Sequence, residues 1–447
     1  MDRTAIRAAV EAELALEREF AGLPAFVVEG GEMDGVLGEV ARRMGDNFPY
    51  FHPLYAGQML KPPHPVARAA YALAMGINPN NHALDGGRAS SKMEMEAVAA
   101  LARIFNYEKH LGHLTSGGTF ANLEALWVAG QVVPGRVVAS EQAHYTHSRI
   151  SGVLGLEFAS VACDRAGRMC MKALELELER GGVRTVVVTL GSTALGAVDP
   201  LPEVVKLREK YGFRIHVDAA YGGYFVLAEN LKPSTGAAFS VIGEADSIVV
   251  DPHKHGLQPY GCGCVLFKDP GVGRFYKHDS PYTYFSSKDL HLGEISLECS
   301  RAGAAAVALW ATQSMFPMVR GGKFAKGLEA GREAAVDLFQ RLSGDARFLT
   351  GPEPELDIVV WAVRGDSIED SGKRARAIFD AAAERDLHLA LVTLNAGLFM
   401  DESVGNVDQG MVCLRSVLMK PEHREWMDEI WKRLDAATTE VLGGAPR

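Results

Sequence analysis

The sequence predicts an α/β protein whose mostly parallel sheet is covered by helices on both faces. Apolar, β-branched runs recur at residues 185–190, 214–217, 247–250 and 264–267. These runs are continuously apolar instead of alternating with polar residues, which is typical of strands buried on both faces. Helical stretches lie before and between the runs, and this alternation of strands with helices favours parallel connections.

The N-terminal part is predicted to form a helix and an arm. The segment MDRTAIRAAVEAELALEREF indicates an acidic amphipathic helix without the apolar core of a signal peptide. Residues 45–82 are rich in proline, asparagine, histidine and aromatic residues, and we expect an extended arm with turns there. A further helix is predicted by apolar residues that share one face at helical spacing: Met95, Val98, Leu101, Ala102 and Phe105.

From about residue 324 the rhythm of elements changes, which indicates a separate, smaller α+β domain. The expected order is a long helix to about 342, a strand, a helix, two strands and a last helix, with strands near 358–363, 389–392 and 411–417. A chain of 447 residues has room for two or three domains of about 100–200 residues each. We therefore expect an N-terminal helix and arm at 1–82, a large domain at 83–323 and a small C-terminal domain at 324–447.

Charge and composition exclude several classes of partner. The chain has 46 basic and 56 acidic residues, a net charge of −10, which argues against nucleic acid or an anionic membrane surface as the main partner. No apolar run approaches the roughly 18 residues of a membrane span. The six cysteines are scattered, and we expect a cytoplasmic protein with free thiols.

A glycine-containing loop before a helix is the first candidate for ligand binding. In HLTSGGTFANLEALWVAG the segment 116–119 precedes an apolar run. Glycines let the backbone approach a ligand closely, and the N–H groups at a helix start favour an anion. The loop matches neither the P-loop nor the dinucleotide-binding GxGxxG pattern. Taken alone, it is better explained as a tight turn.

Three polar motifs follow strands or lie between them. Asp218 ends the apolar run in RIHVDAAYGG, at the edge where open α/β sheets usually bind ligands, although a helix N-cap also explains such an aspartate. The small Ala219 and Ala220 leave room for a flat ligand. SEQAHYTHSRI contains His144 and His147, and a lone histidine is more often structural. TLGSTALGAVDP places a polar turn after a strand.

A lysine between two histidines, in SIVVDPHKHG, completes the pattern. Lys254 follows an apolar run, and lysine is rarely buried unless it is paired. A lysine whose pKa is lowered forms Schiff bases with carbonyl groups. A phosphate-type loop, a histidine, a strand-end aspartate and a strand-end lysine, in this order, predict a pyridoxal phosphate site.

Zinc binding is the rival interpretation of the same region. The pairs H-x-H and C-x-C are formed by His253, His255, Cys262 and Cys264. Residues two apart on a strand share a face, so four ligands could meet. Structural zinc sites usually use longer C-x₂₋₄-C spacing, and zinc leaves the glycine loop and Asp218 unexplained. We therefore predict no metal.

Together these motifs resemble the group II pyridoxal phosphate-dependent amino acid decarboxylases, of the aspartate aminotransferase fold type (fold type I). The resemblance runs from about residue 48 to 420 and rests on HLTSGGTFANLEAL, EQAHYT, GSTALGAVDP, HVDAAYGG, DPHKHGLQPYGCG and ECSRAGAAAVALW. It implies a large domain with a mostly parallel seven-stranded sheet between helices, a small C-terminal α+β domain, and an N-terminal arm. It also implies a homodimer, with the arm crossing to the second subunit.

The resemblance assigns roles to individual residues. Lys254 would carry the internal aldimine, and Asp218 would bond the pyridine nitrogen. His144 would stack on one face of the ring, and Ala220 would touch the other. Thr193 would lie near the ring hydroxyl or the substrate carboxylate. The phosphate would be held by Gly118, Thr119 and His253.

The residues that would recognise the substrate are candidates, each with an alternative role. Arg415, in VCLRSVL, is the candidate anchor for the substrate carboxylate, because a guanidinium grips a carboxylate in two places; a surface ion pair is the alternative. His52, in FHPLY, is the candidate for the side-chain pocket, or it caps a turn. Arg301 serves the site or a subunit contact. The family usually has an aromatic residue after the lysine, where this chain has His255, and this leaves the substrate class open.

The segment 275–294 has no helical or strand period and is predicted to be a lid or binding loop. It is shorter than in animal aromatic decarboxylases. In the resembling family a loop here reaches in from the partner subunit and carries a catalytic tyrosine. Tyr284 is the first candidate and Tyr282 the second. The alternative is a surface excursion whose tyrosines merely pack.

We therefore predict decarboxylation of an L-amino acid to its amine and carbon dioxide, with pyridoxal 5'-phosphate as cofactor, through a Lys254 aldimine and a quinonoid intermediate. Two alternatives use the same site: an aldehyde-forming oxidative deaminase and a transaminase. A more remote alternative is a non-catalytic dimeric binding protein, against which the intact Lys254 and Asp218 argue.

Overall fold

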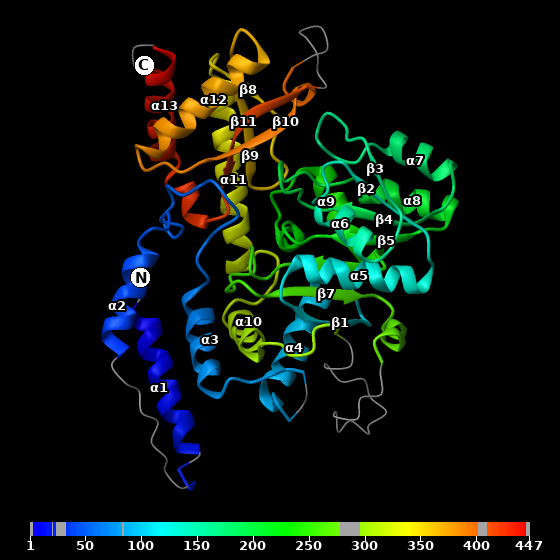
Figure 1. Cartoon of the computed structure of the whole chain (residues 1–447), viewed down its shortest axis with the longest axis vertical. Helices are drawn as coiled ribbons and strands as arrows, with labels where there is room; N and C mark the ends of the chain where they lie inside the picture. Colours follow the sequence, from blue (N-terminus) through cyan, green and yellow to red (C-terminus); the bar gives the residue numbers. More distant parts are fainter. Residues whose placement is uncertain are drawn as a thin grey trace.

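Two β-sheets organise the chain, each with its own layer of helices (Figure 1). The structure is a computed structural model, and it describes residues 3–19, 21–23, 33–82, 85–277, 296–400 and 409–443. In this part of the chain, no helix combines the length and the hydropathy that a bilayer crossing requires.

The larger sheet has seven strands in the order β1-β7-β6-β5-β4-β2-β3. Only β7 runs antiparallel to its neighbours, and every other pair is parallel. The predicted mostly parallel seven-stranded sheet is therefore confirmed. The strands are β1 (Leu111–Thr115), β2 (Arg136–Ser140), β3 (Phe158–Val161), β4 (Val183–Thr189), β5 (Arg214–Asp218), β6 (Ser247–Val250) and β7 (Gly263–Phe267).

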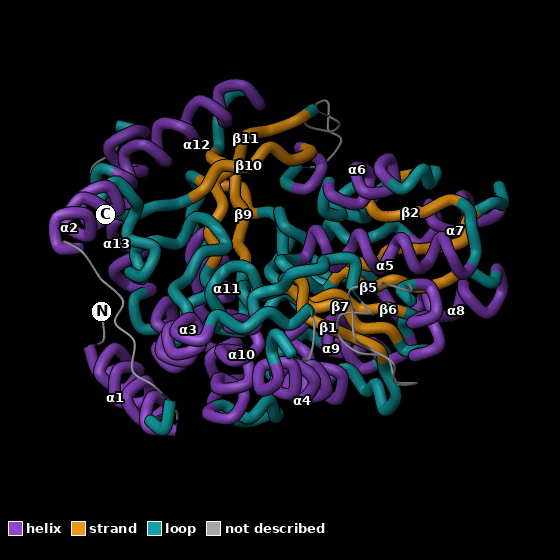
Figure 2. Tube along the Cα trace, turned by 60° about the horizontal axis from the view of Figure 1, so that its bottom comes forward, coloured by secondary structure: helices purple, strands orange, loops and turns teal. Residues whose placement is uncertain are grey.

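Helices cover both faces of this sheet, which explains the continuously apolar strands (Figure 2). In β4, Val186 packs in the same buried cluster as Val98 of α4, whereas Val187 packs with Leu126 of α5. Successive side chains of a strand point to opposite faces, so neither face can be polar. The helices of this region are α4 (Arg88–Ile104), α5 (Gly118–Val132), α6 (Thr146–Val153), α7 (Met171–Glu179), α8 (Leu201–Tyr211), α9 (Pro233–Ser240) and α10 (Gly303–Met315).

The smaller sheet is antiparallel, in the order β10-β11-β9-β8. Its strands are β8 (Phe348–Thr350), β9 (Ile358–Val363), β10 (Ala390–Asn395) and β11 (Gly410–Val417). Its helices are α11 (Lys323–Ser343), α12 (Ile368–Ala383) and α13 (Met427–Leu442). These elements pack in a separate core around the fully buried Trp361, as expected of a small α+β unit. The exact domain borders stay a prediction.

The N-terminal part contains α1 (Arg3–Glu19), α2 (Met33–Met44) and α3 (Pro65–Ile77). The expectation of an extended arm throughout 45–82 is wrong for α3. Pro65 is tolerated in the first turn of a helix, and Nδ1 of His64 accepts a hydrogen bond of 3.2 Å from the N–H of Val66. The helix then packs against α10, and this tertiary contact stabilises it.

The first half of the arm lies against the small sheet of its own chain. The N–H of Ala56 donates to the carbonyl of His388 at 2.9 Å, and the N–H of Val417 donates to the carbonyl of Ala56 at 2.7 Å. This contact brings the arm next to β11, and therefore next to Arg415.

Candidate active site

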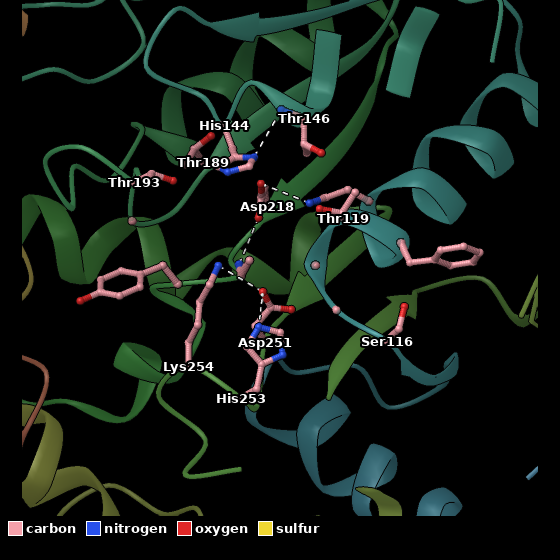
Figure 3. A pocket seen from close by; sticks show the side chains of 17 residues that line it. Ser116, Thr119, His144, Thr146, Thr189, Thr193, Asp218, Asp251, His253 and Lys254 are labelled. Atoms are coloured by element: carbon pink, nitrogen blue, oxygen red, sulfur yellow. Dashed lines mark hydrogen bonds and ion pairs between the residues drawn. The ribbon is translucent and has the colours of Figure 1, made fainter. Parts of the chain in front are cut away.

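A cavity of about 440 Å³ opens at the carboxyl ends of β4, β5 and β6 and at the start of α5 (Figure 3). This is the edge at which open α/β sheets bind ligands. Every residue predicted to bind the cofactor lines the cavity: Gly118, Thr119, His144, Thr193, Asp218, Ala220, His253 and Lys254.

The glycine loop forms the N-terminus of α5 and one wall of the cavity. The helix begins at Gly118, and the first N–H groups of a helix have no intrahelical partner. A Cβ atom at Gly118 would lie 2.6 Å from Oδ2 of Asp251, so a larger residue would displace this wall. The loop therefore combines free N–H donors with a close backbone approach, the properties of an anion site.

Asp218 is a buried and ionised carboxylate. Its Oδ2 accepts hydrogen bonds from Nε2 of His147 at 2.8 Å and from Nδ2 of Asn122 at 3.4 Å, and its Oδ1 accepts one from the N–H of Ala220 at 3.1 Å. Burial alone would raise the pKa of Asp218, but the hydrogen bond from His147 and the nearby Lys254 outweigh it and hold the pKa well below its usual range. The carboxylate is thus suited to a cationic partner.

His216 orients the amide of Asn122 from behind. Its Nε2 lies 2.8 Å from Oδ1 of Asn122, and its Nδ1 lies 2.9 Å from Oγ of Ser247. Burial lowers the pKa of His216 to about 3, so the imidazole is neutral. Because an amide oxygen only accepts, Nε2 carries the proton, and the amide NH₂ of Asn122 is turned toward Asp218.

Lys254 reaches the cavity beside a second buried carboxylate. Its Nζ lies 3.1 Å from Oδ2 of Asp251, which is 2% exposed. The same oxygen lies 3.5 Å from Nε2 of His253. Oδ1 of Asp251 and Nδ1 of His253 are buried and have no hydrogen-bond partner among the described residues.

His144 presents a neutral ring to the cavity. Its centroid lies 4.4 Å from that of Tyr145, and its Nδ1 accepts a hydrogen bond of 3.3 Å from the N–H of Thr146. Burial lowers the pKa of His144. A neutral imidazole held in this way can stack on a flat ligand.

Sequence reasoning missed the residues that support this site. The sequence analysis does not predict Asn122, His216 or Asp251, and it favours a structural role for a histidine such as His147. One signal was available: His216 and Asp218 are two apart on an apolar strand, so they share a face of the sheet. A second was Asp251, which directly follows β6, close to the way Asp218 forms the last residue of β5.

Arg415 lies beside the cavity, and the surface ion pair considered for it is wrong. The side chain is buried, its Nη2 donates to the carbonyl of Thr193 at 2.7 Å, and its Nη1 donates to Oε1 of Gln58 at 3.3 Å. Within the described chain it forms no ion pair. Its role toward a substrate stays a prediction.

His52 is not brought to the cavity. Its Nδ1 accepts a hydrogen bond of 3.1 Å from the N–H of Leu54, and its ring packs edge-on against Trp426 at 4.8 Å. It therefore caps a turn, which was the alternative considered for it. Tyr282 and Tyr284 lie outside the described residues.

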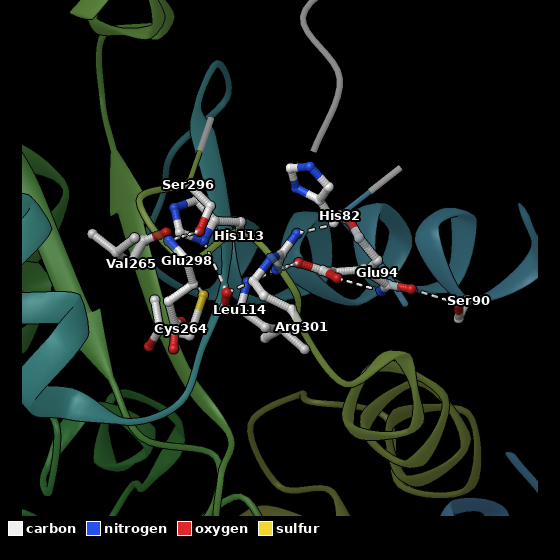
Figure 4. Close-up of polar contacts among 12 residues, drawn as sticks. His82, Ser90, Glu94, His113, Leu114, Cys264, Val265, Ser296, Glu298 and Arg301 are labelled. Carbon is white, nitrogen blue, oxygen red and sulfur yellow. Dashed lines mark hydrogen bonds and ion pairs between the residues drawn. The ribbon is translucent and has the colours of Figure 1, made fainter. Parts of the chain in front are cut away.

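Arg301 forms a buried structural network (Figure 4). Its Nη1 pairs with Glu94 of α4 and donates to the carbonyl of Leu114 in β1 at 2.8 Å. Nδ2 of Asn81 donates to the same carboxylate at 2.5 Å. In this chain Arg301 thus holds α4 against β1 and does not line the cavity.

The side chains of the H-x-H and C-x-C pairs do not meet at one point where they could share a metal ion. Nε2 of His255 lies 3.3 Å from Oδ2 of Asp357, whereas Sγ of Cys264 faces the carbonyl of Val265 at 3.8 Å. Across the described ranges, no three His, Cys, Asp or Glu side chains form a group that could hold a metal ion. The zinc interpretation therefore has no support.

These residues fit pyridoxal phosphate. The amine of Lys254 can bond an aldehyde, the ionised Asp218 can hold a protonated ring nitrogen, and the start of α5 offers N–H donors to a phosphate. The partnerless Nδ1 of His253 is a further buried polar atom at the same wall. The fold and the site thus define an enzyme that uses this cofactor.

The chain belongs to the pyridoxal-dependent decarboxylase family, because residues 49–364 match the pyridoxal-dependent decarboxylase conserved domain. It is similar to an L-tyrosine decarboxylase of Levilactobacillus brevis, with 27% identity covering 78% of this chain and 73% of that protein. It is also similar to a probable L-tyrosine/L-aspartate decarboxylase of Methanothermobacter thermautotrophicus, with 28% identity covering 68% of this chain and 82% of that protein.

Solved structures share the fold. Mouse CSAD in apo form has a TM-score of 0.79 at 18% identity and covers 98% of this chain and 99% of its own. Oryza sativa TDC with PLP and tryptamine has a TM-score of 0.78 at 17% identity, with 99% of both chains covered. The chain is thus a pyridoxal 5'-phosphate-dependent carboxy-lyase of fold type I that acts on an amino acid.

Proposed function

We propose that this enzyme decarboxylates an L-amino acid at the cavity between β4, β5, β6 and α5, with Lys254 and Asp218 as the central residues. The observation that carries the proposal is that the Lys254 amine and the ionised Asp218 carboxylate open onto one cavity with the start of α5. The relatives named for tyrosine and aspartate make these two amino acids the first substrates to test.

Asp218 would hold a proton on the ring nitrogen of the cofactor. A unit charge pair at 4 Å is worth about 4 kcal/mol at an effective dielectric near 20. His147 and Asn122 keep the carboxylate ionised and fixed. When bound, pyridoxal phosphate accepts the electron pair that is left when the bond between Cα and the carboxylate breaks.

The other residues bind, orient and exclude water. Lys254 would hold the cofactor covalently through Nζ and release it to the incoming amino group. His144 and Ala220 would enclose the ring from its two faces. Donors at Gly118, Thr119 and His253 would hold the phosphate.

Arg415 would bind the substrate carboxylate. It is buried beside Thr193 with no carboxylate partner in the described part of the chain, and its Nε has no hydrogen-bond partner there. Burial lowers the pKa of Arg415, yet a guanidinium stays charged at any working pH. An incoming carboxylate would supply the missing counter-charge.

A substrate panel tests the function. The cofactor-loaded enzyme is incubated with each common L-amino acid, and carbon dioxide, amine, aldehyde and peroxide are measured. Decarboxylation predicts amine and carbon dioxide in equal amounts for at least one amino acid. Aldehyde with peroxide would indicate the oxidative deaminase, and turnover that requires pyruvate or 2-oxoglutarate would indicate the transaminase.

The enzyme is proposed to be a homodimer. The N-terminal helices support this, because α1 exposes Ile6, Val10 and Leu14 on one face, and α2 exposes Val36 and Val40. Exposed apolar faces of this kind mark interaction surfaces. Light scattering should give twice the 48.2 kDa chain mass, and V36E/V40E should favour monomer; a monomeric wild type at micromolar concentration would contradict the proposal.

The cytoplasmic location stays a prediction.

A further inference from the structure

A second cavity, of about 520 Å³, lies behind the lysine segment. Its walls include the arm at 61–65, the start of α11, and the turn at 420–422 that follows β11. His255 lines this cavity, whereas the preceding residue, Lys254, lines the active-site cavity. Consecutive residues of one short segment therefore line the two cavities.

Three lysine side chains on this wall form no ion pair with a described residue, and a fourth, Lys326, pairs with Glu329 at 2.7 Å. Lys61, Lys323 and Lys420 line the cavity, and none forms an ion pair with a described residue. Nζ of Lys420 donates to the carbonyl of Tyr55 at 2.6 Å, but an ammonium group has three N–H donors. The acidic residue on the wall is Glu422, which is exposed at its rim.

Burial of two of these lysines, Lys420 and Lys61, has an electrostatic cost. Lys420 is 4% exposed, and desolvation lowers the pKa of Lys420 to about 7 and that of Lys61 to about 8. Buried charges in proteins are normally paired. An anion between these side chains would satisfy their free donors and restore the charged form of both.

Apart from His64 and His255, the remaining wall is apolar. Phe316 and Phe324 are buried, and Leu257 and Pro63 also line the cavity. Sites for small organic ligands combine such walls with a few placed polar groups, in volumes of roughly 300–1,000 Å³. Inorganic ions need no apolar wall of this extent.

We propose that this second cavity binds a small organic anion, an apolar group that carries a phosphate or a carboxylate. The anionic end lies between Lys61, Lys323 and Lys420, and the apolar end packs on Phe316 and Phe324. Its occupancy acts on the back of the active site, because His255 lies 3.3 Å from Asp357, which accepts a hydrogen bond of 2.5 Å from Tyr221, a residue of the active-site cavity.

Calorimetric titration of the cofactor-loaded enzyme with phenyl phosphate tests the proposal. Binding to one site per chain is expected, without loss of cofactor absorbance, because the cofactor's own phosphate site is filled. Titration with phthalate shows whether a carboxylate source is preferred to a phosphate source. Neutral benzyl alcohol should bind at least tenfold more weakly than the better of the two anions.

Substitutions locate the binding. K323M, at an exposed residue without a hydrogen-bond partner in the described chain, should weaken phenyl phosphate binding at least fivefold, and K61M should do the same. K373M is the control, because Lys373 does not line the cavity and is paired with Glu369 at 2.7 Å; its affinity should stay within twofold. Absence of binding by both anions, or binding unchanged in K323M and K61M, would overturn the proposal.

Discussion

Nε2 of His147 donates a hydrogen bond of 2.8 Å to Oδ2 of Asp218, and both side chains are buried. The bond is made to a charged acceptor, and such bonds contribute about 1.5–3 kcal/mol. Under the proposed function, His147 would act on the cofactor through Asp218, as a positioning residue.

Replacing His147 by phenylalanine keeps the ring volume but removes the donor. We expect H147F to lower kcat/KM by about tenfold to a hundredfold, because each 1.4 kcal/mol is a factor of ten. H147Q keeps a donor and should recover much of the loss. If H147F and H147Q have equal activity and unchanged pH profiles, the hydrogen bond has no role in positioning.

Asp218→Asn removes the charge that holds the ring proton. The variant should fold and bind the cofactor, since the amide is isosteric with the carboxylate. It should lose most of its activity, because the electron-accepting form of the ring is no longer stabilised. Cofactor content by absorbance and amine formation by chromatography measure the two effects separately; near-normal turnover would refute this role for Asp218.

The free energy of unfolding is expected to depend on pH through His216. Its folded-state pKa is about 3, whereas an unperturbed histidine titrates near 6.5. Below that pH the unfolded chain binds more protons than the folded one, so the free energy of unfolding falls as pH falls. From pH 7 to pH 5 this single group should cost about 2 kcal/mol.

Chemical denaturation of wild type and H216Q at the two pH values measures this contribution. Glutamine can keep both hydrogen bonds but does not titrate. The wild type should therefore lose about 2 kcal/mol more than the variant. Equal losses would mean that His216 is not held neutral in the folded enzyme.

The loop tyrosines are predicted to deliver a proton to Cα of the product. Y284F should leave cofactor binding intact and slow amine formation at least tenfold, about 1.4 kcal/mol of barrier, with some turnover diverted to aldehyde, ammonia and peroxide. Y282F is the parallel variant. Wild-type amine rates without aldehyde in both variants would leave these tyrosines with packing roles only.

The sequence predicted correctly the features that are encoded by residues close together in the chain. Apolar runs predicted β4 to β7 within about two residues, and Asp218 was predicted at the ligand-binding edge of the sheet. It failed for α3, where proline-rich composition concealed a helix stabilised by α10. It also failed for Asn122 and His216, which are far apart in the sequence and meet only through packing of α5 on β5.

Borohydride reduction of the cofactor-loaded enzyme, followed by peptide mass mapping, tests the central claim most directly. Reduction fixes the bond between the lysine amine and the cofactor. We predict a cofactor-derived mass on the peptide that contains Lys254, and its absence in K254A. A label on another lysine, or no label with the cofactor bound, would contradict the account.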